Sequence, residues 1–176
     1  MGFEIVNSYL REFPALRFIG KKYEMSDMND GSFSAVWEEW DQAERFDQLM
    51  ALSPSPQNDM GVIGFIRWKG NVGSMTGFEY WVGMFFDEGK DVPEGFASLN
   101  LPASQVGITW IKGQMPDIFG SAPVMASWKV LEEKYNAQES GYDGWKYEFE
   151  LYNFERFNEQ LMTGENCVLD YGFYIN

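Results

Sequence analysis

The sequence contains two copies of one pattern, and the second copy lies 88 residues after the first. Matched residues stand at equivalent places of the two copies, namely Pro14-Ala15 and Pro102-Ala103, Val36 and Val124, and Trp40 and Trp128. Because this spacing is half of the 176-residue chain, the repeat predicts a fold built from two similar halves. A chain of this length suits one domain, so we expect a single domain over residues 1–176 with repeat units at about 12–88 and 97–176.

Hydrophobic periodicity predicts a strand, a helix and two further strands in each copy. In the first copy, Ser32 is a candidate N-cap, and Phe33, Val36, Trp37 and Trp40 recur after it at helical spacing. Apolar and alternating runs bounded by glycine and proline predict the strands. The predicted strands cover residues 13–25, 60–69, 77–87, 99–113, 145–153 and 167–175, and the predicted helices cover residues 32–52 and 121–136.

Two such βαββ units predict an α+β fold. Each unit has one amphipathic helix that must bury its apolar face on a sheet. We therefore expect an antiparallel sheet that carries two main helices on one face, with pseudo-two-fold symmetry. A cleft near that axis is the natural place for a ligand.

The residue types that are scarce exclude several classes of protein. Cys167 is the one cysteine and histidine is absent, which argues against disulfide frameworks, zinc sites and catalytic triads. We expect no metal site and no cofactor. Charges or glycines interrupt every hydrophobic stretch before the roughly 18 residues of a membrane span, and the N-terminus does not resemble a signal peptide. We expect a cytoplasmic protein that does not enter the membrane.

The chain carries a formal net charge of −14, from 27 acidic and 13 basic residues. This charge repels phosphates, so we expect no direct binding to nucleic acid. Solubility alone can account for it, but an acidic surface also attracts cationic small molecules or a basic protein partner. Aromatic residues make up 18% of the chain, beside 10 methionines. These side chains belong either to the core or to a pocket for apolar ligands.

Several short strings, in order and from Glu12 onward, resemble the GyrI-like effector-binding family, which is named for a gyrase-inhibitory protein and includes drug-sensing domains of some AraC- and MerR-type regulators. The strings are Glu12-Phe13-Pro14-Ala15, Trp40 in its helix, Val92-Pro93-Glu94-Gly95-Phe96, Leu101-Pro102-Ala103-Ser104-Gln105-Val106, Phe149-Glu150-Leu151-Tyr152 and Tyr174-Ile175-Asn176. Ser104, Val106 and Asn176 depart from the usual glycine, aromatic residue and proline. The resemblance implies a stand-alone ligand domain, because no residues remain for the helix-turn-helix of the regulators.

The resemblance places Glu150 at the acidic residue that attracts cationic lipophilic ligands in drug-sensing relatives. Alternation along the strand puts Lys146, Glu148, Glu150 and Tyr152 on one face, so Glu150 and Tyr152 are able to meet one ligand. The alternative is that this face is simply solvated.

Glu39 is a second candidate, because a continuous helix over residues 32–52 would place it within the apolar arc. The alternative is an edge residue that reaches water or pairs with Arg67 or Lys69. Trp40, Trp110 and Trp128 are candidate ligand-stacking residues, although each is an ordinary choice for a core. The pseudo-symmetry then predicts one cleft with Glu39 and Glu150 as its acids.

Three functions remain open at this stage. The first is a binding module for small lipophilic molecules, aromatic or cationic, with Glu150 neutralising the charge. The second is a hydrolase that opens strained electrophilic rings of alkylating natural products, with Glu150 and Tyr152 as the catalytic pair. The third is modulation of a protein partner such as DNA gyrase, and a homodimer is also open.

Overall fold

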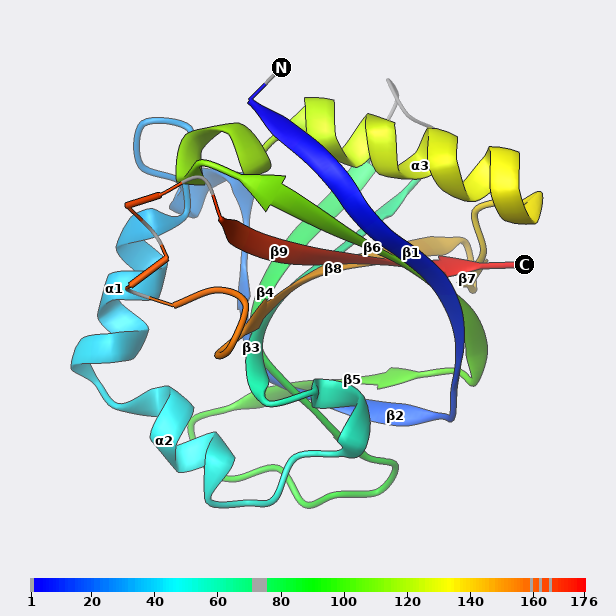
Figure 1. Ribbon diagram of the computed structural model, residues 1–176. Coiled ribbons are helices and arrows are strands. Elements are labelled where there is room, and N and C mark those ends of the chain that lie inside the picture. Colours follow the sequence, from blue (N-terminus) through cyan, green and yellow to red (C-terminus); the bar gives the residue numbers. More distant parts are fainter. Residues whose placement is uncertain (1, 71–75, 159, 162, 165) are drawn as a thin grey trace.

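The strands form one curved antiparallel sheet that holds helices against its convex side (Figure 1). The structure is a computed structural model, and it describes residues 2–70, 76–158, 160–161, 163–164 and 166–176. The strands are β1 (Phe3–Phe13), β2 (Leu16–Tyr23), β3 (Gly61–Lys69), β4 (Thr76–Asp87), β5 (Ala97–Leu101), β6 (Ser104–Gly113), β7 (Gly141–Tyr142), β8 (Trp145–Asn153) and β9 (Cys167–Ile175). The helices are α1 (Ser34–Gln42), α2 (Arg45–Met50) and α3 (Ser121–Tyr135), with short 3₁₀ turns at Met25–Asp27, Pro56–Asn58 and Met115–Ile118.

The order of the strands confirms the pseudo-two-fold symmetry. Along the sheet the order is β1-β6-β9-β8-β3-β4-β2-β5, with β7 added beside β8. In the two halves, β1 corresponds to β5, β2 to β6, β3 to β8 and β4 to β9. When each strand is replaced by its counterpart, the order is the same one read from the opposite edge of the sheet. The axis therefore passes between β3 and β8. There Phe65 pairs with Phe149, each the middle residue of its strand, and their rings stack at 6.4 Å and 7°.

Apart from the two-residue strand β7, each half contains one more strand than the sequence predicts. The predicted strand 99–113 is broken at Pro102 into β5 and β6, and Pro14 likewise separates β2 from the unpredicted β1. Proline cannot donate to a ladder, and at these points the chain changes partners, since β1 pairs with β6 whereas β2 pairs with β4 and β5. The unit is thus ββαββ, and its two prolines stand at equivalent corners.

The predicted helix over residues 32–52 is two helices. Glu44 adopts a left-handed conformation with φ of 55°, which ends α1 and begins α2. Phe33 rather than Ser32 occupies the N-cap position, although the Ser32 hydroxyl still accepts a hydrogen bond from the backbone N–H of Ser34 at 3.1 Å. The break turns α2 back toward α1, so side chains beyond Glu44 no longer follow one helical arc.

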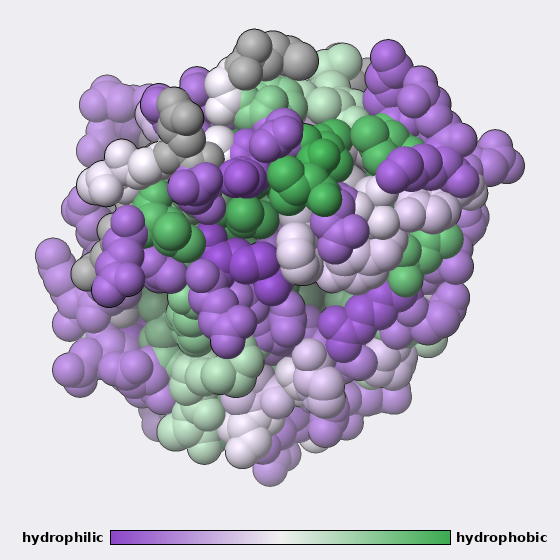
Figure 2. All heavy atoms as spheres, in the orientation of Figure 1, coloured by the Kyte–Doolittle hydropathy of each residue, from purple (hydrophilic) through white to green (hydrophobic). Residues whose placement is uncertain are grey.

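The two faces of the sheet have separate cores. The concave face is filled mainly by aromatic rings, among them Phe13, Phe65, Phe85 and Phe149. On the convex face, α1 and α2 cover one half of the sheet and α3 covers the other. This confirms the prediction that the main helices lie on one face of the sheet, although the described residues form three helices because the predicted helix over residues 32–52 is divided. Hydrophilic residues cover most of the surface seen in Figure 2, as the net charge of −14 predicts. Within the described ranges, every helix is too short or too polar to cross a membrane.

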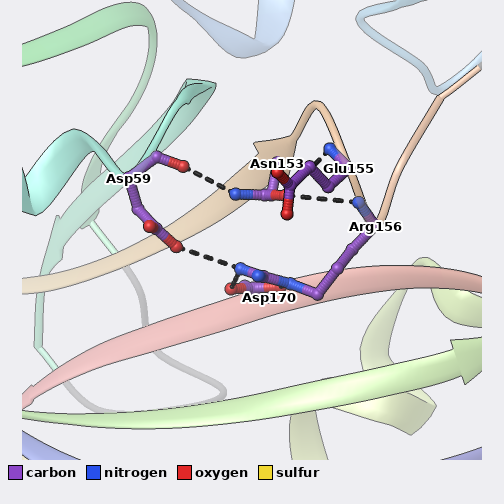
Figure 3. Close-up of polar contacts among 5 residues, drawn as sticks. All are labelled: Asp59, Asn153, Glu155, Arg156 and Asp170. Atoms are coloured by element: carbon purple, nitrogen blue, oxygen red, sulfur yellow. Dashed lines mark hydrogen bonds and ion pairs between the residues drawn. The ribbon is translucent and has the colours of Figure 1, made fainter.

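A buried ion pair fastens the loop after β8 to the strands on the concave side (Figure 3). Arg156 donates two hydrogen bonds to Asp170 on β9, at 3.1 and 2.6 Å, and one to Asp59 just before β3, at 3.1 Å. Its guanidinium also lies 4.2 Å from the ring centroid of Trp110. Asn153 adds a hydrogen bond to the backbone oxygen of Asp59 at 2.6 Å. The loop is therefore held between the two halves of the sheet.

We expect Arg156→Met to lower the free energy of unfolding by about 3 kcal/mol at pH 7, because it leaves the Asp170 carboxylate buried without its cation. The Asp170 side chain is 1% exposed, and burial raises its pKa to about 6, so the loss should shrink near pH 5, where Asp170 binds a proton. Urea unfolding at both pH values measures this. Lys129→Met is the control, since the exposed Lys129–Glu133 pair should contribute less than about 0.5 kcal/mol.

Candidate functional site

The convex face of β8 presents Glu148, Glu150 and Tyr152 toward the helices. Tyr147, Phe149 and Leu151 alternate with them and belong to the concave core. Tyr152 packs against the helix-side clusters of both halves. The alternative interpretation, that this strand face is simply solvated, is therefore wrong. Helices and loops cover this side and leave these residues only partly exposed.

Two tyrosine hydroxyls hold the carboxylate of Glu150. Tyr152 donates to its Oε2 at 2.6 Å, and Tyr80 on β4 donates to the same oxygen at 3.4 Å. The indole N–H of Trp37 on α1 in turn donates to the Tyr80 oxygen at 3.1 Å. A chain of hydrogen bonds thus joins α1 to the central carboxylate.

Gly64 makes this arrangement possible. It pairs with Glu150 across β3 and β8, and a Cβ at this position would lie 2.6 Å from the Tyr80 hydroxyl oxygen and 3.1 Å from Glu150 Oε2. Any other residue would push one of the two polar groups away. This mid-strand glycine therefore marks a close approach of side chains and not a bulge.

Aromatic rings enclose the carboxylate. Phe33 stacks on Tyr80 at 4.2 Å and 4°. Trp37 contacts Tyr152 edge-to-face at 4.8 Å and 62°, and Phe157 also contacts Tyr152 edge-to-face at 4.9 Å. Two of these rings, Phe33 and Trp37, come from the start of α1, so this helix forms one wall of the site.

Burial shifts the acid–base equilibria of the site. It raises the pKa of Glu150, and the hydrogen bonds from Tyr152 and Tyr80 offset part of that rise. Burial raises the pKa of Glu148 to about 8, with further contributions from the charges of Glu150 and Glu139. Lys146, on the same strand, pairs with Glu139 at 2.5 Å. The site therefore contains one carboxyl group held by hydroxyls and a second that favours its neutral form.

The structure brings together only two of the residues singled out from the sequence, Glu150 and Tyr152. Trp40 is fully buried in the core beneath α1, where it donates to the Tyr23 hydroxyl at 2.8 Å. Trp128 packs on Phe173 at 4.9 Å, under α3. Trp110 lies on the opposite, concave face, beneath Arg156.

The expectation that Glu39 points into the core is wrong. Its side chain is 49% exposed and pairs with Arg45, the first residue of α2, rather than with Arg67 or Lys69. The break at Glu44 brings Arg45 back to this position. The second acid of the site is instead Glu148, so both acids come from β8 and not one from each half.

Sequence reasoning assigned no role to Glu148, Tyr80, Phe33 or Trp37 in the site. Alternation along the strand does place Glu148 on the correct face. Gly64 is the one further sequence signal of the site, because a glycine inside a strand often marks a close approach of other groups. Tyr80 and Trp37 follow the ordinary pattern of core residues, and only the fold shows that they meet at Glu150.

Comparisons with known proteins show the fold. No family model matches the chain, and no curated protein matches it in sequence. Among solved structures, SAV2435 bound to tetraphenylphosphonium is 16% identical with a TM-score of 0.64, over 97% of this chain and 94% of that one. The C-terminal domain of EcmrR is 13% identical with a TM-score of 0.53, over 100% and 99%. A hydrolase encoded by lin2189 from Listeria innocua is 9% identical with a TM-score of 0.54, over 96% and 91%.

These similarities confirm the resemblance to the GyrI-like effector-binding family at the level of the fold. The α+β class, the antiparallel sheet and the helices on one face are those expected from the sequence.

The titration of Glu148 predicts how stability depends on pH. In the folded protein its pKa is raised to about 8, whereas the unfolded chain loses this proton near the ordinary value of 4.5. The folded state thus binds more protons between these values, and the free energy of unfolding falls as pH rises through this window. Glu150 and Lys146 on β8, Glu139 and Tyr171 are the charged and titratable groups around it.

We expect Glu148→Gln to flatten this slope between pH 6 and 8, above the pKa of about 6 of Asp170. The change should be at most about 1.4 kcal/mol per pH unit. Urea unfolding of both proteins at several pH values measures it. An unchanged slope would show that Glu148 ionises normally in the folded protein.

Proposed function

We propose that this protein binds small lipophilic organic cations, with Glu150 as the group that compensates the positive charge. The observation that carries the proposal is the setting of this carboxylate. It is held by two hydroxyls and enclosed by aromatic rings, and among the described residues no lysine or arginine pairs with it.

A bound cation would improve the energetics of this site. A buried carboxylate without a counter-charge is costly, and an organic cation supplies the charge without the strong hydration of an ammonium or metal ion. Its flat groups bury apolar area, and the faces of Trp37, Tyr80 and Tyr152 each contribute about 0.5–2 kcal/mol by cation–π attraction. The formal net charge of −14 also attracts cations from solution.

Ligand entry involves the wall formed by α1. Phe33 and Trp37 lie against Tyr80 and Tyr152 in this structure, so a ligand reaching Glu150 displaces one of these rings. The hydrogen bond from Trp37 to Tyr80 then breaks or changes partner, and the ligand reports its presence to α1. Such a link suits an effector-binding module. SAV2435, which shares the fold, has been solved with the lipophilic cation tetraphenylphosphonium.

Hydrolysis is the weaker alternative. A general base needs a lone pair free to accept a proton from the nucleophile, but Oε2 of Glu150 already accepts two hydroxyl hydrogen bonds, which offset part of the rise that burial causes in its pKa. The Tyr152 and Tyr80 hydroxyls are committed to this carboxylate, so neither points a free proton at a substrate. Binding of a cation requires no proton transfer to a substrate, and the hydrogen bonds from Tyr152 and Tyr80 favour the charged form of Glu150 that it needs.

We expect tetraphenylphosphonium to bind and to raise the melting temperature, and tetraphenylborate, of the same shape and opposite charge, to do neither. Glu150→Gln should weaken the binding of tetraphenylphosphonium at least tenfold, about 1.4 kcal/mol, in isothermal titration calorimetry. Glu39→Gln is the matched control and should change affinity less than about threefold, since its carboxylate lies on the surface.

Retained affinity in Glu150→Gln would overturn the role proposed for this carboxylate. Equal stabilisation by the cation and the anion would show that apolar contact alone drives binding.

A further inference from the structure

Glu148 is a second carboxylate in the site, and nothing in the described part of the chain neutralises it. The charges that act on it are those of Glu150 and Glu139, which both repel its negative form. Lys146 directs its ammonium to Glu139 instead. The Glu148 side chain is half-buried on the helix-covered face of β8.

The surroundings of Glu148 differ from those of Glu150. Glu148 pairs with Ile66 on β3 and Phe173 on β9, and Trp128 of α3 packs on Phe173 at 4.9 Å. Glu150 instead faces the rings carried by α1 and β4. Each carboxylate thus has apolar neighbours of its own, one set beneath α3 and the other beneath α1.

We propose that Glu148 is a second anionic subsite and that the site takes flat aromatic dications in preference to monocations of the same shape. This rests on the proposed function of Glu150. The two residues are alternate members of one strand, so their side chains leave the same face about 7 Å apart. A rigid ligand with two cationic centres at that separation meets both carboxylates and leaves neither of them buried alone.

A single cation does not satisfy both positions. A monocation bound at Glu150 does not reach Glu148. Glu148 then keeps its proton near neutral pH, because its pKa is raised to about 8. Bound as a dication, the ligand replaces that proton. Dication binding near neutral pH should therefore release close to one proton, whereas monocation binding should release only a fraction, because it removes just the contribution of the Glu150 charge to the raised pKa of Glu148.

The test compares methyl viologen with N-methyl-4-phenylpyridinium. The two ions have nearly the same flat shape, and they differ in that methyl viologen has a second cationic nitrogen at the far end. We expect the wild-type protein to bind methyl viologen at least tenfold more tightly at pH 8 in isothermal titration calorimetry. At pH 7, titration in buffers of different ionisation enthalpy should show a larger proton release for methyl viologen than for N-methyl-4-phenylpyridinium.

Variants separate the two carboxylates. Glu148→Gln should reduce the preference for methyl viologen to less than threefold and leave the affinity for N-methyl-4-phenylpyridinium within threefold of wild type. Glu150→Gln should weaken both ions at least tenfold. Circular dichroism and urea unfolding establish that each variant is folded, and glutamine retains the size of either side chain.

The outcomes distinguish the two proposals. Equal affinity of the wild-type protein for the two ions, or an unchanged preference in Glu148→Gln, would overturn the subsite and leave the role of Glu150 intact. Binding of both ions that Glu150→Gln does not weaken would overturn the proposed function itself. A preference that is lost only in Glu148→Gln, together with proton release, supports the subsite.

Discussion

The pairing of β3 with β8 at the centre of the sheet determines where every side chain of the site lies. This pairing places Phe65 against Phe149, and alternation from that point assigns each neighbour to one face. The aromatic core on the concave side fixes the register, because a shift by one residue would bury Glu148 and Glu150 among phenylalanines. The packing of the concave core thus holds the carboxylates in position on the convex side.

Two carboxyl groups beneath a layer of helices cost stability, and the surrounding residues limit that cost. Gly64 leaves room for the Tyr80 hydroxyl beside Glu150, and Tyr152 donates the shorter hydrogen bond. Glu148 has no such donors among the described residues and retains a proton instead, at the pKa of about 8 that burial imposes. The free energy lost here is offset elsewhere, in the aromatic core and in the ion pairs of Arg156. The organic cation proposed above would supply the missing positive charge and so stabilise the folded protein.

The overall plan of the fold follows from local patterns in the sequence, and the errors arise where distant segments meet. Repeat spacing and alternation predict the two halves, the helix layer and the face that carries Glu150. β1 escapes prediction because it is an edge strand whose residues are mostly exposed or half-buried, so it has no clear apolar alternation. The split at Pro102 reflects a change of strand partners, which one segment does not reveal.

The same reasoning explains which site residues were missed. Glu39 was assigned from the wheel of one continuous helix, and the left-handed conformation at Glu44 ends that helix and supplies Arg45 as its partner. Trp110 lies on the concave face, opposite Glu150. Alternation within one strand shows which residues share a face, but it does not show which face of the sheet that is. Tyr80 reaches Glu150 across an intervening strand, since β3 lies between β4 and β8. No local pattern contains that contact.

The backbone is pseudo-symmetric, but its charges are not. Counted from the central pair Phe65 and Phe149, the residues equivalent to Glu148 and Glu150 are Gly64 and Ile66. The glycine lies opposite Glu150 and the isoleucine opposite Glu148, so the first half supplies space and apolar surface while the second supplies both charges. Both acidic residues of the site therefore lie on β8, and divergence of these two positions makes the two sides of the axis chemically different.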